Sequence, residues 1–97
     1  MMKPSEALSR HRDEVLEVIG RYPVSNPRVF GSTARGEDTD DSDLDILVDR
    51  AGVLTYFDLA RLEIELEQLL GVPVGVHTPG EFRQAMMARI EADRRAL

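Results

Sequence analysis

The sequence predicts a small α+β domain in which helices flank a mixed β-sheet. Two stretches, one near the N-terminus and one after residue 55, carry apolar side chains at the spacing of amphipathic helices. Between them, residues 43–49 place apolar side chains on one face of a strand and acidic side chains mainly on the other. Residues 72–76 form another apolar run after the second helix, and a strand reached through a helix usually lies parallel to the strand before it.

The first half of the chain is expected to contain one helix and one short strand. Ser5 is the expected N-cap of a helix that continues to about Arg21. The apolar stripe of this helix consists of Leu8, Val15, Leu16 and Ile19. Residues 22–27 contain two prolines and are expected to be a short connection, after which residues 28–30 form a strand that stops at Gly31.

The second half is expected to contain a helix, a strand and a last helix. The helix starts at about Thr55 and ends at Gly71, a residue type that favours the conformation found after helices. Its leucines at helical spacing are Leu59, Leu62, Leu66, Leu69 and Leu70. A right-handed crossover would place position 75 of the strand 72–76 beside the strand 43–49. The last helix, from about Glu81, offers as core or partner contacts Phe82, Met86, Met87 and Ile90.

The turn after residue 30 has the features of a phosphate-binding site. Gly31 lets the backbone turn sharply and approach a ligand closely, because it has no side chain. Ser32 can then start a helical turn as its N-cap, which leaves backbone N–H groups and a hydroxyl free for an anion. Arg35 lies one helical turn further, where it can contact a phosphate or pair with the acidic loop that follows.

Asp43 and Asp45 are the candidate metal ligands. Side chains two apart on a strand point to the same face, roughly 6–7 Å apart at the backbone, so these carboxylates can converge on a cation. Oxygen ligands favour Mg²⁺ or Mn²⁺ over zinc or copper. The alternative is a solvated acidic loop entering an ordinary edge strand. A calcium loop of the EF-hand type is rejected, because its glycine and glutamate positions would fall on Asp43 and Asp49.

Composition limits the classes of function. Seven acidic residues and no basic one lie within residues 37–49, so the net charge of −6 is concentrated at the proposed site. Such a field attracts cations and repels bare nucleic acid. There is no cysteine, no signal-like start and no apolar span of membrane length, which together predict a cytoplasmic protein without membrane contact. The 97 residues are expected to form a single domain, 1–97.

These residues resemble the minimal nucleotidyltransferases, the smallest members of the DNA polymerase beta-like nucleotidyltransferase superfamily. The resemblance covers nearly the whole chain and rests on Gly31-Ser32, Arg35-Gly36, Ser42-Asp43-Leu44-Asp45 and Leu47-Val48-Asp49. It implies transfer of a nucleoside monophosphate from ATP or another nucleoside triphosphate to an acceptor hydroxyl with two magnesium ions, and adenylyl transfer is the leading expectation. In this scheme Asp43 and Asp45 bind metal, whereas Gly31 and Ser32 hold the triphosphate. The resemblance also implies an antitoxin role beside a helical HEPN-type toxin.

One position departs from the family pattern. The family usually has a third acidic residue in the next strand, where this chain has Val74-Gly75-Val76. Gly75 can neither bind metal nor take a proton. His77 points to the same strand face and is a possible substitute, although a histidine near a strand end is more often structural.

Three functions are therefore compared. The leading one is magnesium-dependent adenylyl transfer from ATP to a protein acceptor, in an antitoxin paired with a HEPN toxin. The first alternative, raised by Gly75, is a catalytically impaired module that neutralises a partner by forming a complex. The second alternative is a small-molecule transferase of the antibiotic-modifying kind, which the lack of a substrate domain disfavours.

Overall fold

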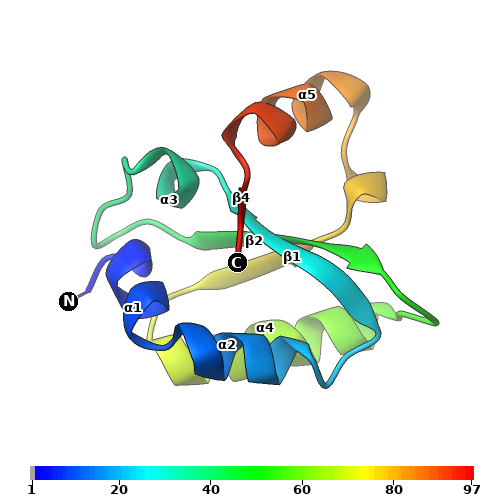
Figure 1. Ribbon diagram of the computed structural model, residues 1–97, viewed down its shortest axis with the longest axis horizontal. Coiled ribbons are helices and arrows are strands. Elements are labelled where there is room, and N and C mark those ends of the chain that lie inside the picture. The colour runs from blue at the N-terminus through cyan, green and yellow to red at the C-terminus, as the bar shows by residue number, and fades with distance from the viewer. Residues whose placement is uncertain (1) are drawn as a thin grey trace.

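A four-stranded mixed sheet organises the protein, whose computed structural model describes residues 2–97 (Figure 1). The strands are β1 (Val24–Phe30), β2 (Leu44–Arg50), β3 (Val74–His77) and β4 (Arg95–Ala96). Their order across the sheet is β3-β2-β1-β4. β2 runs antiparallel to β1 and parallel to β3, whereas β4 pairs antiparallel with β1. The predicted α+β class with a mixed sheet is confirmed.

Three helices cover one face of the sheet (Figure 1). They are α1 (Pro4–Arg10), α2 (Arg12–Ile19) and α4 (Tyr56–Leu70). The main hydrophobic core lies between them and the sheet, and its central strand residues are Leu44, Ile46 and Val48, each fully buried. The predicted alternation of β2 is confirmed on this face, because burial of alternate side chains follows the pleat of the strand.

The predicted second helix is confirmed at both ends. Thr55 caps α4: its hydroxyl accepts a hydrogen bond from the backbone N–H of Asp58, and the Asp58 carboxylate accepts one from the N–H of Thr55. Gly71 ends the helix at a φ of 72°, in the left-handed conformation that glycine adopts without strain. The chain then enters β3, and the parallel register places Gly75 opposite Asp45 as predicted.

A second, smaller core lies on the opposite face, beneath α5 (Gln84–Asp93). Ile90, only 2% exposed, packs there against Phe30 and Leu47, with Phe82 and Met87 partly buried beside them. The last helix starts at Gln84 and not at about Glu81 as predicted, because Pro79–Glu81 forms a separate 3₁₀ turn, η1. Of the expected partner contacts, Met86 is substantially exposed at 43%, whereas Ile90 belongs to this core.

The N-terminal helix differs from the prediction. Ser5 is not its N-cap: the helix begins at Pro4 after Lys3, and the backbone N–H of Ser5 donates to Asp38 Oδ2 at 2.8 Å. Proline favours the first helical turn because it has no N–H to leave unpaired. The helix is also interrupted at His11, whose φ of −120° separates α1 from α2.

The predicted connection at residues 22–27 is wrong from Val24 onward, because β1 already pairs with β2 there. The register shifts between Ser25 and Arg28, and Asn26 in that bulge has a φ of 51°. The bulge lets a strand contain Pro27, which cannot donate to the ladder. Strand β4 was not predicted at all; Leu97 N–H donates to Pro27 O beside it.

No helix of the described residues is long and apolar enough to cross a membrane.

Candidate functional site

The turn between β1 and α3 (Ser32–Arg35) brings the backbone against a carboxylate. Phe30 pairs with Asp45 across β1 and β2, so Gly31 follows directly beside Asp45. Gly31 has a φ of 73°, and a Cβ at this position would lie 3.1 Å from Asp45 Oδ2. Glycine is therefore required twice, for the conformation and for the close approach. Gly31 itself is the N-cap of α3, so the prediction that Ser32 is the N-cap is wrong.

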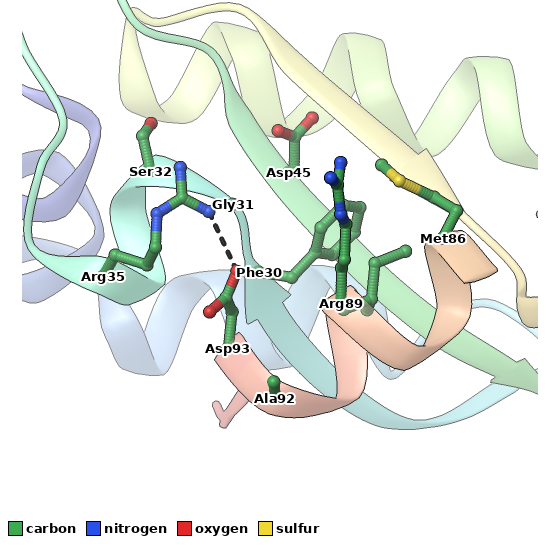
Figure 2. Close-up of a pocket in the computed structure, with 10 residues that line it drawn as sticks. Phe30, Gly31, Ser32, Arg35, Asp45, Met86, Arg89, Ala92 and Asp93 are labelled. Atoms are coloured by element: carbon green, nitrogen blue, oxygen red, sulfur yellow. Dashed lines mark hydrogen bonds and ion pairs between the residues drawn. The ribbon is translucent and has the colours of Figure 1, made fainter.

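A pocket of about 560 Å³ opens at this turn (Figure 2). β1, β2, α3 and α5 contribute its walls. Its lining residues are Phe30, Gly31, Ser32, Arg35, Asp45, Met86, Arg89, Ile90, Ala92 and Asp93. The structure thus gathers four of the predicted site residues, Gly31, Ser32, Arg35 and Asp45, in one concave site of the size that holds a small ligand.

The two candidate metal ligands occupy different settings. Asp45 lies within β2, with its side chain 36% exposed to the pocket. Asp43 is exposed, precedes the first residue of β2 and does not line the pocket. Among residues 2–97, no group of three or more His, Cys, Asp or Glu side chains is arranged to hold a metal ion by itself.

Asp49, the last acidic residue of β2, has a structural role. Its carboxylate accepts hydrogen bonds from Arg28 Nη1 at 3.2 Å and from the Asn26 amide at 3.2 Å. Arg28 is almost completely buried, so this ion pair compensates a charge that would otherwise be costly inside the fold. Asp49 is therefore separate from the pocket.

His77 occupies the space above Gly75. A Cβ at Gly75 would lie 2.8 Å from His77 Nε2 and 3.4 Å from Asp45 Oδ1. The same Nε2 is 3.8 Å from Asp45 Oδ1, and Nδ1 is 3.0 Å from Glu81 Oε2. The Asp45 carboxylate first, and then Glu81, raise the pKa of His77 to about 9 against the opposing effect of burial. A cationic imidazole thus stands beside Asp45 and above Gly75, the position for which the resemblance implied a third carboxylate.

Two phenyl rings fix the position of His77. The ring centroids of Phe30 and Phe82 lie 5.8 Å and 5.5 Å from that of His77. Aromatic packing of this kind restricts the imidazole to the orientation that faces Asp45. The sequence indicated which strand face His77 occupies, but not this packing, because Phe82 comes from a separate turn.

Arg35 is engaged by two carboxylates. Its Nη1 donates to Asp93 Oδ2 at 2.9 Å, and its Nε donates to Glu37 Oε2 at 3.4 Å (Figure 2 shows the first bond). These hydrogen bonds, with Asp93 the larger contributor, raise the pKa of Arg35. Of the two predicted roles of Arg35, the structure contains the ion pair with the acidic loop and adds one with α5.

The pocket residues on α5 were not identified from the sequence. Met86, Arg89, Ile90 and Asp93 follow helical spacing and present one face of α5 to the turn after β1. That spacing was visible in the sequence. What it could not reveal was that the chain folds back across the sheet, so that this face meets the site.

Comparison with known proteins matches residues 8–97 to the model of the nucleotidyltransferase domain family. Protein adenylyltransferase MntA of Thermococcus cleftensis is 43% identical over 67 residues, covering 69% of this chain and 65% of that protein. A solved structure described as a minimal nucleotidyltransferase superposes with a TM-score of 0.84 at 38% identity, over 96% of this chain and 95% of that one.

The fold also recurs in a toxin–antitoxin assembly. A structure of a tri-AMPylated Shewanella oneidensis HEPN toxin in complex with MNT antitoxin matches with a TM-score of 0.69 at 14% identity, over 91% of this chain and 69% of that one. At that identity the likeness concerns the fold. The family match spans most of the sequence, including the turn and both aspartates, and the chain therefore belongs to the nucleotidyltransferase domain family.

Proposed function

We propose that this protein transfers the adenylyl group of ATP to a hydroxyl of a protein acceptor. The observation that carries the proposal is the contact of the Gly31 turn with Asp45 at the wall of the pocket. This turn brings backbone N–H groups, which suit phosphate, next to a carboxylate, which suits a metal. The adenylyltransferase name of the Thermococcus cleftensis relative supports ATP as the donor and a protein as the acceptor.

Asp43 and Asp45 are the proposed ligands of Mg²⁺ or Mn²⁺. Their oxygen donors fit a hard cation, and magnesium is commonly held by one or two carboxylates together with substrate phosphates. This fits a protein whose described residues hold no metal cluster of their own. When bound, the metal would neutralise charge that develops on the phosphates. Gly31 and Ser32 would hold the triphosphate, and Arg35 would contact it after leaving Asp93.

The proposed reaction is a displacement at the α-phosphorus. The acceptor oxygen forms a bond to this phosphorus while the bond to the bridging oxygen of the β-phosphate breaks and pyrophosphate leaves. The hydroxyl proton must pass to a base, and Gly75 supplies none. His77 is the proposed substitute at the third position, where its Nε2 faces Asp45 at 3.8 Å; because its pKa is raised to about 9, it can accept this proton only after it has lost its own. The ATP substrate also supports the expected cytoplasmic location.

A HEPN-type toxin is the proposed acceptor and partner. The fold shared with the MNT antitoxin of the Shewanella oneidensis complex supports this. The name protein adenylyltransferase of the Thermococcus cleftensis relative agrees with an acceptor that is a protein and disfavours a small-molecule transferase. Exposed apolar side chains suitable for contact include Met86 on α5, Tyr56 and Phe57 at the start of α4, and Val53 in the loop before it. We further propose that residues 1–97 act as one domain.

The test uses ATP labelled at the α-phosphate and the protein encoded by the neighbouring gene, co-expressed with this chain. A partner heavier by one or more adenylyl groups, seen by intact mass, would support the enzyme. Asp43→Asn with Asp45→Asn should abolish the label, whereas Asp40→Asn, an exposed acid of the same loop, should not. A stable complex without added mass would favour the binding module instead. Neither complex nor label, with a neighbour that is not helical, would contradict both.

A further inference from the structure

Arg89 is the one charged side chain of the pocket that has no ionic partner among the described residues. The other charged residues that line it are engaged: Arg35 pairs with Asp93 at 2.9 Å, and Asp45 faces His77 at 3.8 Å. Figure 2 draws the bond between Arg35 and Asp93, and none reaches Arg89. An unpaired guanidinium in the pocket of a strongly acidic protein, with a net charge of −6, indicates a site that binds an anion.

The core beneath α5 fixes where Arg89 lies. Ile90 is anchored against Phe30 and Leu47, so the neighbouring position on the helix is turned toward the pocket. Met86, one turn earlier, lines the same wall. The contact of Ile90 thus holds the helix so that Arg89 lies across the pocket from the Gly31 turn. The Arg89 side chain itself is exposed.

We infer that Arg89 binds the polyphosphate of the nucleotide, beyond its α-phosphate, and so selects triphosphates over monophosphates. This inference rests on the proposed function. Guanidinium groups bind phosphate oxygens through two parallel hydrogen bonds, which gives strength and orientation. With Asp45 assigned to the metal and Gly31 to the triphosphate turn, Arg89 supplies positive charge from the opposite wall. Arg35 cannot do so without first giving up Asp93.

Arg83 provides a matched control. It is the N-cap residue of α5 and exposed like Arg89. Both arginines line a neighbouring hollow of about 320 Å³, but only Arg89 also lines the pocket that contains Asp45. Removing either arginine changes the net charge equally. Only loss of Arg89 should remove a contact with the nucleotide.

The experiment measures by calorimetry the binding of magnesium complexes of AMP and of an ATP analogue with a methylene group between its α- and β-phosphates, which blocks transfer. Arg89→Ala should weaken binding of the analogue about ten- to hundredfold, the effect of losing hydrogen bonds to a charged group. Binding of AMP should change by less than about threefold, and Arg89→Lys should retain part of the affinity. Arg83→Ala should leave both ligands unaffected.

The outcomes separate the inference from the proposed function. Wild type that binds neither ligand would refute the proposed function itself. If wild type and Arg89→Ala bind the analogue equally well, only the role of Arg89 is refuted. Equal weakening of AMP and analogue would also refute it, because the contact would then not involve the polyphosphate. If Arg89→Ala does not fold, as seen by circular dichroism, Arg89→Gln provides the same comparison.

Discussion

Restoring a carboxylate at position 75 should require removal of His77. Family resemblance alone predicts that Gly75→Asp increases transfer, because it supplies the missing ligand. The structure adds an obstacle, since the new Cβ would lie 2.8 Å from His77 Nε2, closer than real Cβ contacts allow. The introduced side chain can therefore be accommodated only if the imidazole shifts from its position between Asp45 and Glu81, and we expect that shift to break its two ion pairs.

The expected loss of stability comes from two ion pairs. Displacing His77 breaks its pairs with Asp45 and Glu81, whose side chains are 36% and 34% exposed, so each is worth up to about 1 kcal/mol after screening. The free energy of unfolding of Gly75→Asp should fall by about 1–2 kcal/mol, which lowers Tm by about 4–16 °C in a chain of this size. When His77→Ala is added, the introduced carboxylate gains both space and access to the metal, and transfer should rise at least about tenfold over Gly75→Asp alone.

The assay compares transfer of labelled adenylate and thermal unfolding in Gly75→Asp, His77→Ala and the double variant. Gly75→Ala is the matched control, because it adds the Cβ without the carboxylate and so isolates the displacement of His77. If Gly75→Asp alone equals the double variant in transfer, His77 does not compete for this position. If wild type is active and His77→Ala leaves its rate unchanged, two carboxylates suffice and His77 is no substitute.

Further predictions concern His77, two glycines and the cap of α4. Without metal, the pKa of His77 rises from 6.5 unfolded to about 9 folded, so its stabilisation is complete below about pH 6.5 and lost as pH rises through about 9. Urea titrations should show this loss in wild type but not in His77→Gln. Gly31→Ala should destabilise the fold by about 1 kcal/mol more than Gly36→Ala. Both glycines have a φ of 73°, but only a Cβ at position 31 would meet Asp45. Equal losses of unfolding free energy in the two variants would contradict that contact. Thr55→Ala should cost about 1 kcal/mol; no change in urea midpoint would show that its capping box does not stabilise α4.

The fold was predictable where local patterns and burial agree. The leucines of α4, its cap at Thr55 and its end at Gly71 all indicate the same helix, and the structure contains it. The crossover rule then correctly predicted that β3 is parallel to β2. The N-terminal errors arose where tertiary contacts decide: Ser5 bonds to Asp38, 33 residues away, and β1 continues through Pro27 because a bulge accommodates it.

The candidate site was predictable on the strands and not on α5. Gly31 and Asp45 were both predicted site residues, and the structure brings them together because strand pairing fixes their relation. The arrangement of His77 depends on a turn that returns Glu81 to the imidazole, and that of Arg89 on a helix anchored by Ile90. These contacts join residues through loop geometry, on which side-chain periodicity carries no information. Asp43 remains a predicted ligand on the strength of its spacing from Asp45.

The charge of His77 predicts the order in which metal and nucleotide bind. At neutral pH an imidazolium faces Asp45, so a metal ion arriving alone must compete with this cation and finds no third carboxylate among the described residues. Magnesium that arrives on ATP brings phosphate ligands with it. Mg²⁺ alone should therefore raise Tm by less than about 1 °C. Mg²⁺ with ATP at a hundred times its Kd should stabilise the protein by about 2.7 kcal/mol, a Tm rise of about 10 °C or more. His77→Gln should enlarge the response to Mg²⁺ alone, and equal Tm rises with and without ATP in wild type would show that the protein holds the metal by itself.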